Sequence, residues 1–353
     1  MIEKYYNGVI EQVAGGIGNV EHNSILVRYS NDFSIWDLES VNHYKDQTDI
    51  FFTCHEFSYN KIAEAYEPYL GLIRQMFHKY CSGTLEEFME ECDVYKLQRP
   101  VFESYFEKGF CERTEQILID EVEYEQERMR NSIVTMLQKL SEIRPVVIVL
   151  NRFQLASKST MQLSNSLLQV KNKNIGIVLG VNDVQSIPEF AHEEWDAICE
   201  SMDDRNMVYH IGNAGRNMEP DVMDYYSDYE SDDGYRKLNN LVYFLDFDQA
   251  DHHLSKIERR IKFDNFTISE KKHYQLLLLQ IMVSVLQRDI AKALESCEDL
   301  EKLQDQEKEG AFYYNFWMAT SYMYLGKLEE AMIYVQKAKE CGVELFVLDD
   351  GWF

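Results

Sequence analysis

A run of five apolar residues from Val146 to Leu150, four of them β-branched, constrains the fold more than any other segment of this chain. Such a short and continuous run is typical of a strand that is buried on both faces, as strands inside a parallel sheet are. Parallel strands are joined by crossover connections that are usually helices. The run therefore predicts an α/β domain, with Asn151 and Arg152 at the carboxyl end of a buried strand.

Four further segments have the composition of strands, and helical patterns separate most of them. They span residues 24–29, 49–54, 174–181 and 208–211. Residues 112–143 carry apolar side chains at helical spacing, which predicts a long amphipathic helix leading into the central strand. Because strands that alternate with helices indicate a parallel sheet, we expect an α/β domain over residues 1–215.

Length and charge bound the possible functions. With 353 residues the chain is long enough for two domains, and 45% hydrophobic residues provide material for folded cores. A net charge of −26 argues against nucleic acid and anionic membranes as partners, since binding to phosphate draws on Lys and Arg. No apolar run reaches ~18 residues, so no membrane-spanning helix is expected.

The N-terminus and the cysteines predict a cytoplasmic protein. Residues Met1 to Tyr6 lack the basic and apolar regions of a signal peptide. Seven scattered cysteines without a Cys-x-x-Cys pair fit reduced thiols better than disulfides or a zinc site. The adjacent His252 and His253 would point ~100° apart on a helix, so we expect surface residues rather than a metal site. No metal and no cofactor are predicted.

Composition changes twice in the second half of the chain. Residues 216–237 are acidic, rich in tyrosine and without periodicity, which predicts a mobile linker. Residues 238–343 have helical patterns throughout. Three of their segments share a signature centred on Ala250, Ala293 and Ala331, which are 43 and 38 residues apart.

The last of these three segments resembles a tetratricopeptide repeat. In such repeats, small residues let two helices pack closely and a glycine permits the turn between them. The matching residues are Ala319, Tyr322, Gly326, Leu328, Ala331 and Ala338, whereas Asn315 stands where a tryptophan is favoured. Because the spacing exceeds the ~34 residues of the ideal repeat, the connections must be longer. We expect an all-α helical solenoid that binds a protein partner.

The loop after the first predicted strand, Ser30 to Asp37, contains no glycine and no lysine. Phosphate-binding loops use glycine to let backbone N–H groups converge and lysine to neutralise the phosphates. In this loop Asp32 and Asp37 would instead repel phosphate. The glycines at 15, 16 and 18 precede the strand and predict a turn or the start of a hairpin.

Residues 25–211 resemble the NTPase core of signal-transduction ATPases with numerous domains, a class that precedes helical repeats in MalT-like regulators. The residues that carry the resemblance are the strands at 25–29, 50–54 and 145–150, together with 65–69, 153–157 and 175–183. It implies a P-loop-like fold whose first loop binds nucleotide and whose third strand ends in paired acids. Here Ile35 and Trp36 stand where a lysine and a hydroxyl residue are expected, and Asn151 and Arg152 replace the acids. The output domain of such regulators, DNA-binding or a nucleotide cyclase, is not expected in these residues.

The final residues, Glu344 to Phe353, resemble a strand of melibiase-type α-galactosidases. The resemblance implies that Asp349, Asp350 and Trp352 contact a sugar. A barrel of that class needs ~250 residues, and glycoside hydrolysis needs a pair of catalytic carboxylates. The other interpretation is an apolar strand or loop that packs on the last repeat.

These features together predict a non-catalytic regulatory protein, in which a degenerate ATPase core serves as a scaffold or sensor beside protein-binding repeats. One alternative is an active ATPase with unorthodox site residues. Another is a truncated product of an α-galactosidase-related gene. The sequence leaves the identity of the partner and the oligomeric state open.

Overall fold

A computed structural model divides the chain into two compact units, Met1–Gln249 and Ala250–Phe353. The residues that it describes are 2–21, 23–30, 34–45, 47, 49–59, 61–111, 122–182, 191–203, 207–211, 226–264, 266–303 and 308–340. For residues 226, 227 and 308–310, only the backbone belongs to that description.

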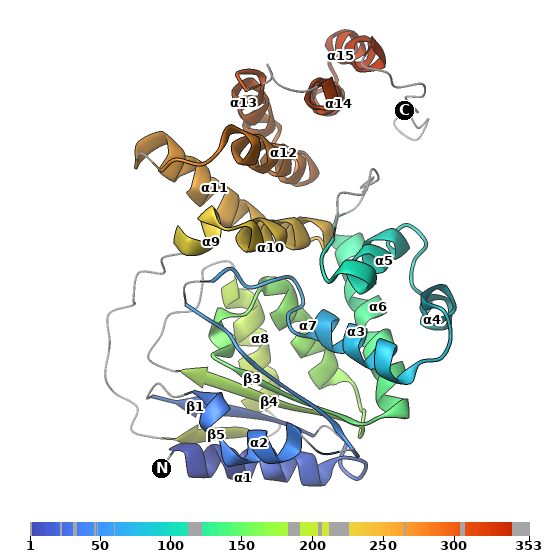
Figure 1. The fold of residues 1–353 in the computed structure, drawn as a ribbon, viewed down its shortest axis with the longest axis vertical. Coiled ribbons are helices and arrows are strands. Elements are labelled where there is room, and N and C mark those ends of the chain that lie inside the picture. Colours follow the sequence, from blue (N-terminus) through green and yellow to red (C-terminus); the bar gives the residue numbers. More distant parts are fainter. Residues whose placement is uncertain are drawn as a thin grey trace. The chain divides into compact units, whose positions relative to one another are not determined.

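The first unit is built on a five-stranded sheet (Figure 1). Its strands lie in the order β2-β3-β4-β1-β5, and all neighbouring pairs are parallel. The strands are β1 (Asn23–Tyr29), β2 (Phe51–Glu56), β3 (Val146–Asn151), β4 (Ile175–Asn182) and β5 (Val208–Ile211). All five predicted strands are confirmed, and β2 continues two residues beyond the predicted end at Cys54.

Helices cover both faces of this sheet (Figure 1). The first face carries α1 (Ile2–Gly16) and α2 (Glu39–Lys45), and the second carries α6 (Val122–Ile143), α7 (Lys158–Gln169) and α8 (His192–Asp203). The predicted helix over 112–143 is confirmed from Val122 onward, and residues 112–121 lie outside the described part. An α/β fold with helices on both faces of a parallel sheet is thus the architecture of this unit.

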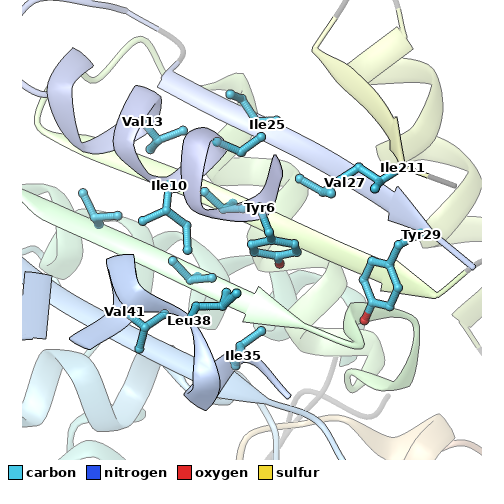
Figure 2. Close-up of a cluster of buried hydrophobic side chains, with 14 residues drawn as sticks. Tyr6, Ile10, Val13, Ile25, Val27, Tyr29, Ile35, Leu38, Val41 and Ile211 are labelled. Carbon is cyan, nitrogen blue, oxygen red and sulfur yellow. The ribbon is translucent and has the colours of Figure 1, made fainter. Parts of the chain in front are cut away.

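Apolar side chains between α1, α2 and the strands form the core of the first face (Figure 2). The cluster contains Tyr6, Val9, Ile10, Val13, Ile25, Val27, Tyr29, Ile35, Leu38, Val41, Val147, Val149, Val178 and Ile211. Because successive strand residues point to opposite faces, Val147 and Val149 face α1, and Asn151 at the end of β3 points to the same side.

Close packing of α1 on β4 depends on two glycines. A Cβ at Gly176 would lie 2.6 Å from Val13 Cγ1, and a Cβ at Gly180 would collide with the Tyr6 hydroxyl. Glycine at these two positions therefore lets the helix approach the strand. The glycines at 15 and 16 end α1, and Gly18 has a φ of 83° in the turn that follows, which confirms the predicted turn.

The remaining elements of the first unit are short. They are η1 (Ile35–Asp37), η2 (Phe153–Leu155), α3 (Tyr69–Tyr80), α4 (Leu85–Glu91), α5 (Arg99–Lys108), α9 (Tyr226–Glu230) and α10 (Asp232–Tyr243).

The predicted linker at 216–237 differs from the structure, because its described part, from residue 226 onward, is helical and packed. The Ser231 hydroxyl caps α10 by accepting a hydrogen bond of 2.8 Å from Gly234 N. Lys237 is buried and lies 3.2 Å from both Asp228 and Asp233. The acidic composition that suggested a mobile linker thus includes the partners of a buried cation. Residues 216–225 lie outside the described part.

The second unit is helical. Its elements are α11 (Phe247–Phe263, which begins before the boundary), α12 (Glu270–Leu286), α13 (Ile290–Glu301), α14 (Lys308–Tyr324) and α15 (Leu328–Glu340). Two pairs of consecutive helices pack together, α12 with α13 and α14 with α15. Ala293 and Ala338 are completely buried and Ala331 is almost so, as close helical packing requires.

The same turn follows α10, α12 and α14, and it also follows α4 at Asp93. Leu245, Arg288 and Gly326 each have a left-handed backbone, with φ of 65°, 65° and 71°. The amide that follows each of them donates to the carbonyl five residues before it, over 2.7, 2.8 and 2.9 Å. This is the Schellman arrangement at the end of a helix. The spacing of Leu245, Arg288 and Gly326, 43 and 38 residues, equals that of the predicted alanine signature.

The prediction that His253 is a surface residue is wrong, because its side chain is only 1% exposed. The centre of its ring lies 5.4 Å from that of His252.

Within the described part of the chain, each helix is too short or too polar to cross a lipid bilayer.

Candidate functional site

The carboxyl ends of β1 and β4 mark the point where connections leave the sheet toward opposite faces. The connection after β1 passes through α2 on the first face, and the connection after β4 passes through α8 on the second (Figure 1). Ligands of open α/β sheets bind at such a switch point, outside the carboxyl ends of the strands. We call the polar group found at this edge the edge cluster; it consists of Tyr29, Ser34, Glu56, Asn151 and Arg152.

Asn151 is the centre of the edge cluster and is completely buried. Its amide oxygen accepts a hydrogen bond of 2.7 Å from the Tyr29 hydroxyl, and its amide nitrogen donates one of 2.9 Å to Glu56. Its backbone carbonyl accepts a bond of 3.0 Å from Phe57 N. Both ends of the side chain are therefore bonded, one to the adjacent strand β2 and the other to β1 on the far side of β4, as a buried amide requires.

Glu56 brings to this edge a carboxylate that the sequence analysis did not predict. Its side chain is 11% exposed and lies 3.9 Å from the Arg152 guanidinium, and it accepts a hydrogen bond of 3.3 Å from the Ser34 hydroxyl. Asn151 and Arg152 therefore share this edge with a carboxylate from the neighbouring strand β2. Because strand residues alternate, extending the predicted strand by two residues past Cys54 would have placed Glu56 here.

Ile35 and Trp36 lie in η1, the single turn that follows β1. Ile35 is completely buried in the core below α1 (Figure 2), and Trp36 is 49% exposed. A side chain at position 35 therefore points into the core and not toward a ligand at the edge. The loop after β1 and the end of β3 are nevertheless connected through Glu56. The Glu56 carboxylate accepts one hydrogen bond from Ser34 of the loop and another from Asn151 of β3.

The chemistry of the edge cluster suits structural bonding more than phosphate or metal binding. Convergent backbone N–H groups and a cation are needed for phosphate, and here Arg152 is placed beside Glu56 and over the Tyr59 ring, 5.2 Å from its centre. Magnesium is usually held by carboxylates together with substrate phosphates. Among the described residues, no group of three or more His, Cys, Asp and Glu side chains is arranged to hold a metal ion.

A second polar group lies along the segment between β2 and α3, residues 57–68, which we call the strap. Asn240 of α10 donates a hydrogen bond of 2.8 Å to Glu64, and the Ser159 hydroxyl of α7 accepts one of 3.2 Å from Tyr66 N. Ile62 N donates a bond of 2.7 Å to Asp228. The strap is thus fixed to helices on two sides.

Burial shifts the titration of three side chains at the strap. It raises the pKa of Glu64 to about 7, raises the pKa of Glu67, and lowers the pKa of His55 to about 4. His55 is therefore neutral at neutral pH, and its contact of 3.5 Å with Glu67 is not an ion pair there. Such shifts accompany both functional sites and structural networks, and the many bonds of the strap favour the structural interpretation.

The predicted sugar-contacting residues, Asp349, Asp350 and Trp352, lie outside the described residues. Comparison with known proteins gives no match for the chain. No protein-family model, no curated protein and no solved structure matches it.

Proposed function

We propose that this chain is a non-catalytic regulatory protein, with an α/β unit that serves as a scaffold or sensor and a helical unit that binds a protein partner. The closed hydrogen-bonding of Asn151 carries the first half of the proposal. At the switch point, where a nucleotide hydrolase needs groups that face the ligand, this side chain is buried and bonded at both ends within the sheet.

Phosphate release from γ-labelled ATP in the presence of Mg²⁺ tests this half. We expect the full chain to release phosphate no faster than a protein-free blank. Glu56→Gln should give the same result, as should Glu86→Gln, which changes an exposed glutamate of α4. Release above the blank that only Glu56→Gln abolishes would contradict the proposal.

That contradictory outcome would support the second candidate, an ATPase with unorthodox residues. The observation in its favour is the Glu56 carboxylate, which lies at the strand ends within reach of Asn151 and Arg152. A carboxylate in this position has the chemistry to orient water or to contact a hydrated metal ion. The hydrogen bonds that it already accepts from Ser34 and Asn151 favour the non-catalytic proposal.

The helical pairs of the second unit support the other half of the proposal. Antiparallel helical pairs with buried alanines and a repeated turn are the building blocks of solenoids, whose surfaces bind peptides and proteins. A partner held by this unit should no longer co-purify when Ala331→Trp overpacks the contact between α14 and α15. It should still co-purify with Gln336→Trp, which changes an exposed residue of the same helix. Equal loss with both variants would contradict the proposal.

A further inference from the structure

The amino ends of the five parallel strands lie at one edge of the sheet, opposite the edge cluster (Figure 1). Basic and apolar side chains gather at this edge, from the ends of α3 and α6 and from the loop that enters β4. We call them the basic edge; it consists of Lys79, Tyr80, Ile143, Arg144, Lys171 and Lys173.

Two cations of the basic edge share one aromatic ring. The Lys79 ammonium nitrogen and the Arg144 guanidinium carbon each lie 5.3 Å from the centre of the Tyr80 ring. Lys79 also lies 5.8 Å from the centre of the Phe51 ring, which meets the Tyr80 ring edge to face. Stacking on aromatic rings restricts both long side chains, so the two charges are placed near each other before any ligand binds.

The loop that carries Lys171 and Lys173 lies beside the end of α6. The Asn172 amide in this loop donates a hydrogen bond of 3.3 Å to the Ser141 hydroxyl of α6. Both lysines are exposed. Ile143, the last residue of α6, is 53% exposed. The basic edge therefore combines four positive charges with exposed apolar surface.

The four basic side chains lack ion-pair partners in the part of the chain that the structure describes. No described carboxylate oxygen lies within 4.0 Å of their nitrogen atoms. The adjoining segments contain the acids Glu142 and Asp49, so the edge still carries more positive than negative charge. This local excess occurs in a chain whose net charge is −26.

Helix ends explain part of this arrangement. Lys79 lies in the last turn of α3 and Arg144 directly follows α6, and a cation in such a place interacts favourably with the helix dipole. That effect concerns each helix by itself. It does not account for two cations on one ring or for the exposed isoleucine beside them.

We propose that the basic edge binds a short acidic peptide segment of a partner protein. The planar guanidinium of Arg144 suits a carboxylate, which it can contact with two parallel hydrogen bonds. The lysines supply further positive charge for neighbouring carboxylates, and Tyr80 and Ile143 supply apolar contact. Four cations match a few carboxylates, whereas a nucleic acid would bring a long row of phosphates to a strongly negative chain. The proposal holds whether or not the helical unit binds a partner.

Fluorescence anisotropy with the full chain tests the proposal. The probes are the fluorescein-labelled peptide Asp-Glu-Leu-Asp-Glu-Leu and its amide counterpart Asn-Gln-Leu-Asn-Gln-Leu. We expect the acidic peptide to bind saturably and at least about tenfold more tightly than its counterpart, because several exposed ion pairs add together. Equal affinities, or no saturable binding of the acidic peptide, would overturn the proposal. Equally tight binding of a labelled single-stranded oligothymidine would also overturn it and would assign the edge to nucleic acid.

Two substitutions in the basic edge have matched controls in the same unit. Arg144→Gln removes one guanidinium of the basic edge. Its control, Arg236→Gln, removes an exposed guanidinium that lies 5.0 Å from the centre of the Phe110 ring. Lys79→Gln is paired in the same way with Lys96→Gln, at an exposed lysine between α4 and α5.

We expect Arg144→Gln and Lys79→Gln each to weaken binding of the acidic peptide about threefold to tenfold, and the two controls to change it by less than about twofold. The four side chains are exposed or partly exposed, and circular dichroism checks that the variants are folded. If the two cations serve only the helix dipoles, Arg144→Gln and Lys79→Gln will lower stability in urea while their affinity for the peptide equals that of the controls. That result would overturn the proposal.

Discussion

Replacing Asn151 by aspartate places an acid at the end of β3, next to Glu56. In the structure Asn151 is completely buried, and its amide nitrogen donates a hydrogen bond of 2.9 Å to the Glu56 carboxylate. Asn151→Asp removes that donor and sets a second carboxyl against the first. The change in volume is negligible, so any loss of stability reports on charge and hydrogen bonding.

The expected magnitude follows from these contacts. Loss of a hydrogen bond to a charged acceptor costs about 1.5–3 kcal/mol. Two like charges at this separation would repel by about 6 kcal/mol at an effective dielectric constant near 20. Protonation limits that repulsion, because one of two carboxyls in contact has a strongly raised pKa. We therefore expect a loss of about 3–5 kcal/mol at pH 8 and about 1–2 kcal/mol at pH 5.

Urea denaturation at the two pH values measures this difference. The sign is fixed by linkage: a carboxyl whose folded pKa is raised stabilises below its unfolded pKa, and that stability is lost as the pH rises. The control is Asn131→Asp, a change at an exposed position of α6, which should alter stability by less than about 0.5 kcal/mol at either pH. If Asn151→Asp behaves like this control at pH 8, Asn151 does not lie buried against a carboxylate.

Three further predictions test other parts of the structure by denaturation. Gly180→Ala should lower the free energy of unfolding by about 2–3 kcal/mol, because the new methyl group would collide with the Tyr6 hydroxyl. Gly8→Ala in α1 has open space and should raise it by about 0.5–1 kcal/mol; equal effects would refute the close approach of α1 to β4. Glu64 should lower stability as the pH rises from 4.5 to about 7, because burial raises its pKa to about 7 and the folded chain then holds a proton that the unfolded chain releases; His55, whose pKa burial lowers to about 4, acts in the opposite direction. Glu64→Gln should remove the first contribution and make the slope of stability against pH more positive over this range, and an unchanged slope would show that Glu64 is exposed. Ala331→Trp should cost about 1–3 kcal/mol by overpacking α14 and α15, whereas thermal stability equal to that of Gln336→Trp would exclude close packing at Ala331.

Local pattern was sufficient to predict the strands and the repeated helical signature. The apolar runs of β1, β3 and β4 needed no tertiary information, because buried strands are continuously apolar, whereas β2 and β5 are less buried and were predicted from composition. Gly326 likewise predicted the turn before α15, since a left-handed residue is required there. At the corresponding places Leu245 and Arg288 adopt the same conformation, which their residue types did not indicate.

Features that depend on distant partners were not predictable in the same way. The strand order places β1 between β4 and β5, and no local pattern contains that information. The acidic segment before α10 is packed in its described part because Lys237 finds Asp228 and Asp233, a pairing invisible in composition. α1 is a different case. Its buried residues Tyr6, Val9, Ile10 and Val13 have helical spacing, so local pattern alone is sufficient to predict this helix.

The edge cluster contains residues that local pattern predicted and one residue that it did not. Asn151 and Arg152 were found from the strand that they end, whereas Glu56 was missed because the predicted strand stopped short. That carboxylate changes the description of the site. The edge contains an acid, and the bonds of that acid to Asn151 and Ser34 hold different segments together.

Equilibrium dialysis of the full chain against labelled ATP with Mg²⁺ tests most directly whether this edge binds nucleotide. The proposed non-catalytic function predicts no saturable binding, and the same flat response for wild type and for Arg152→Ala. Saturable binding at micromolar ATP that Arg152→Ala weakens at least tenfold would contradict that account and would identify the edge cluster as a working nucleotide site.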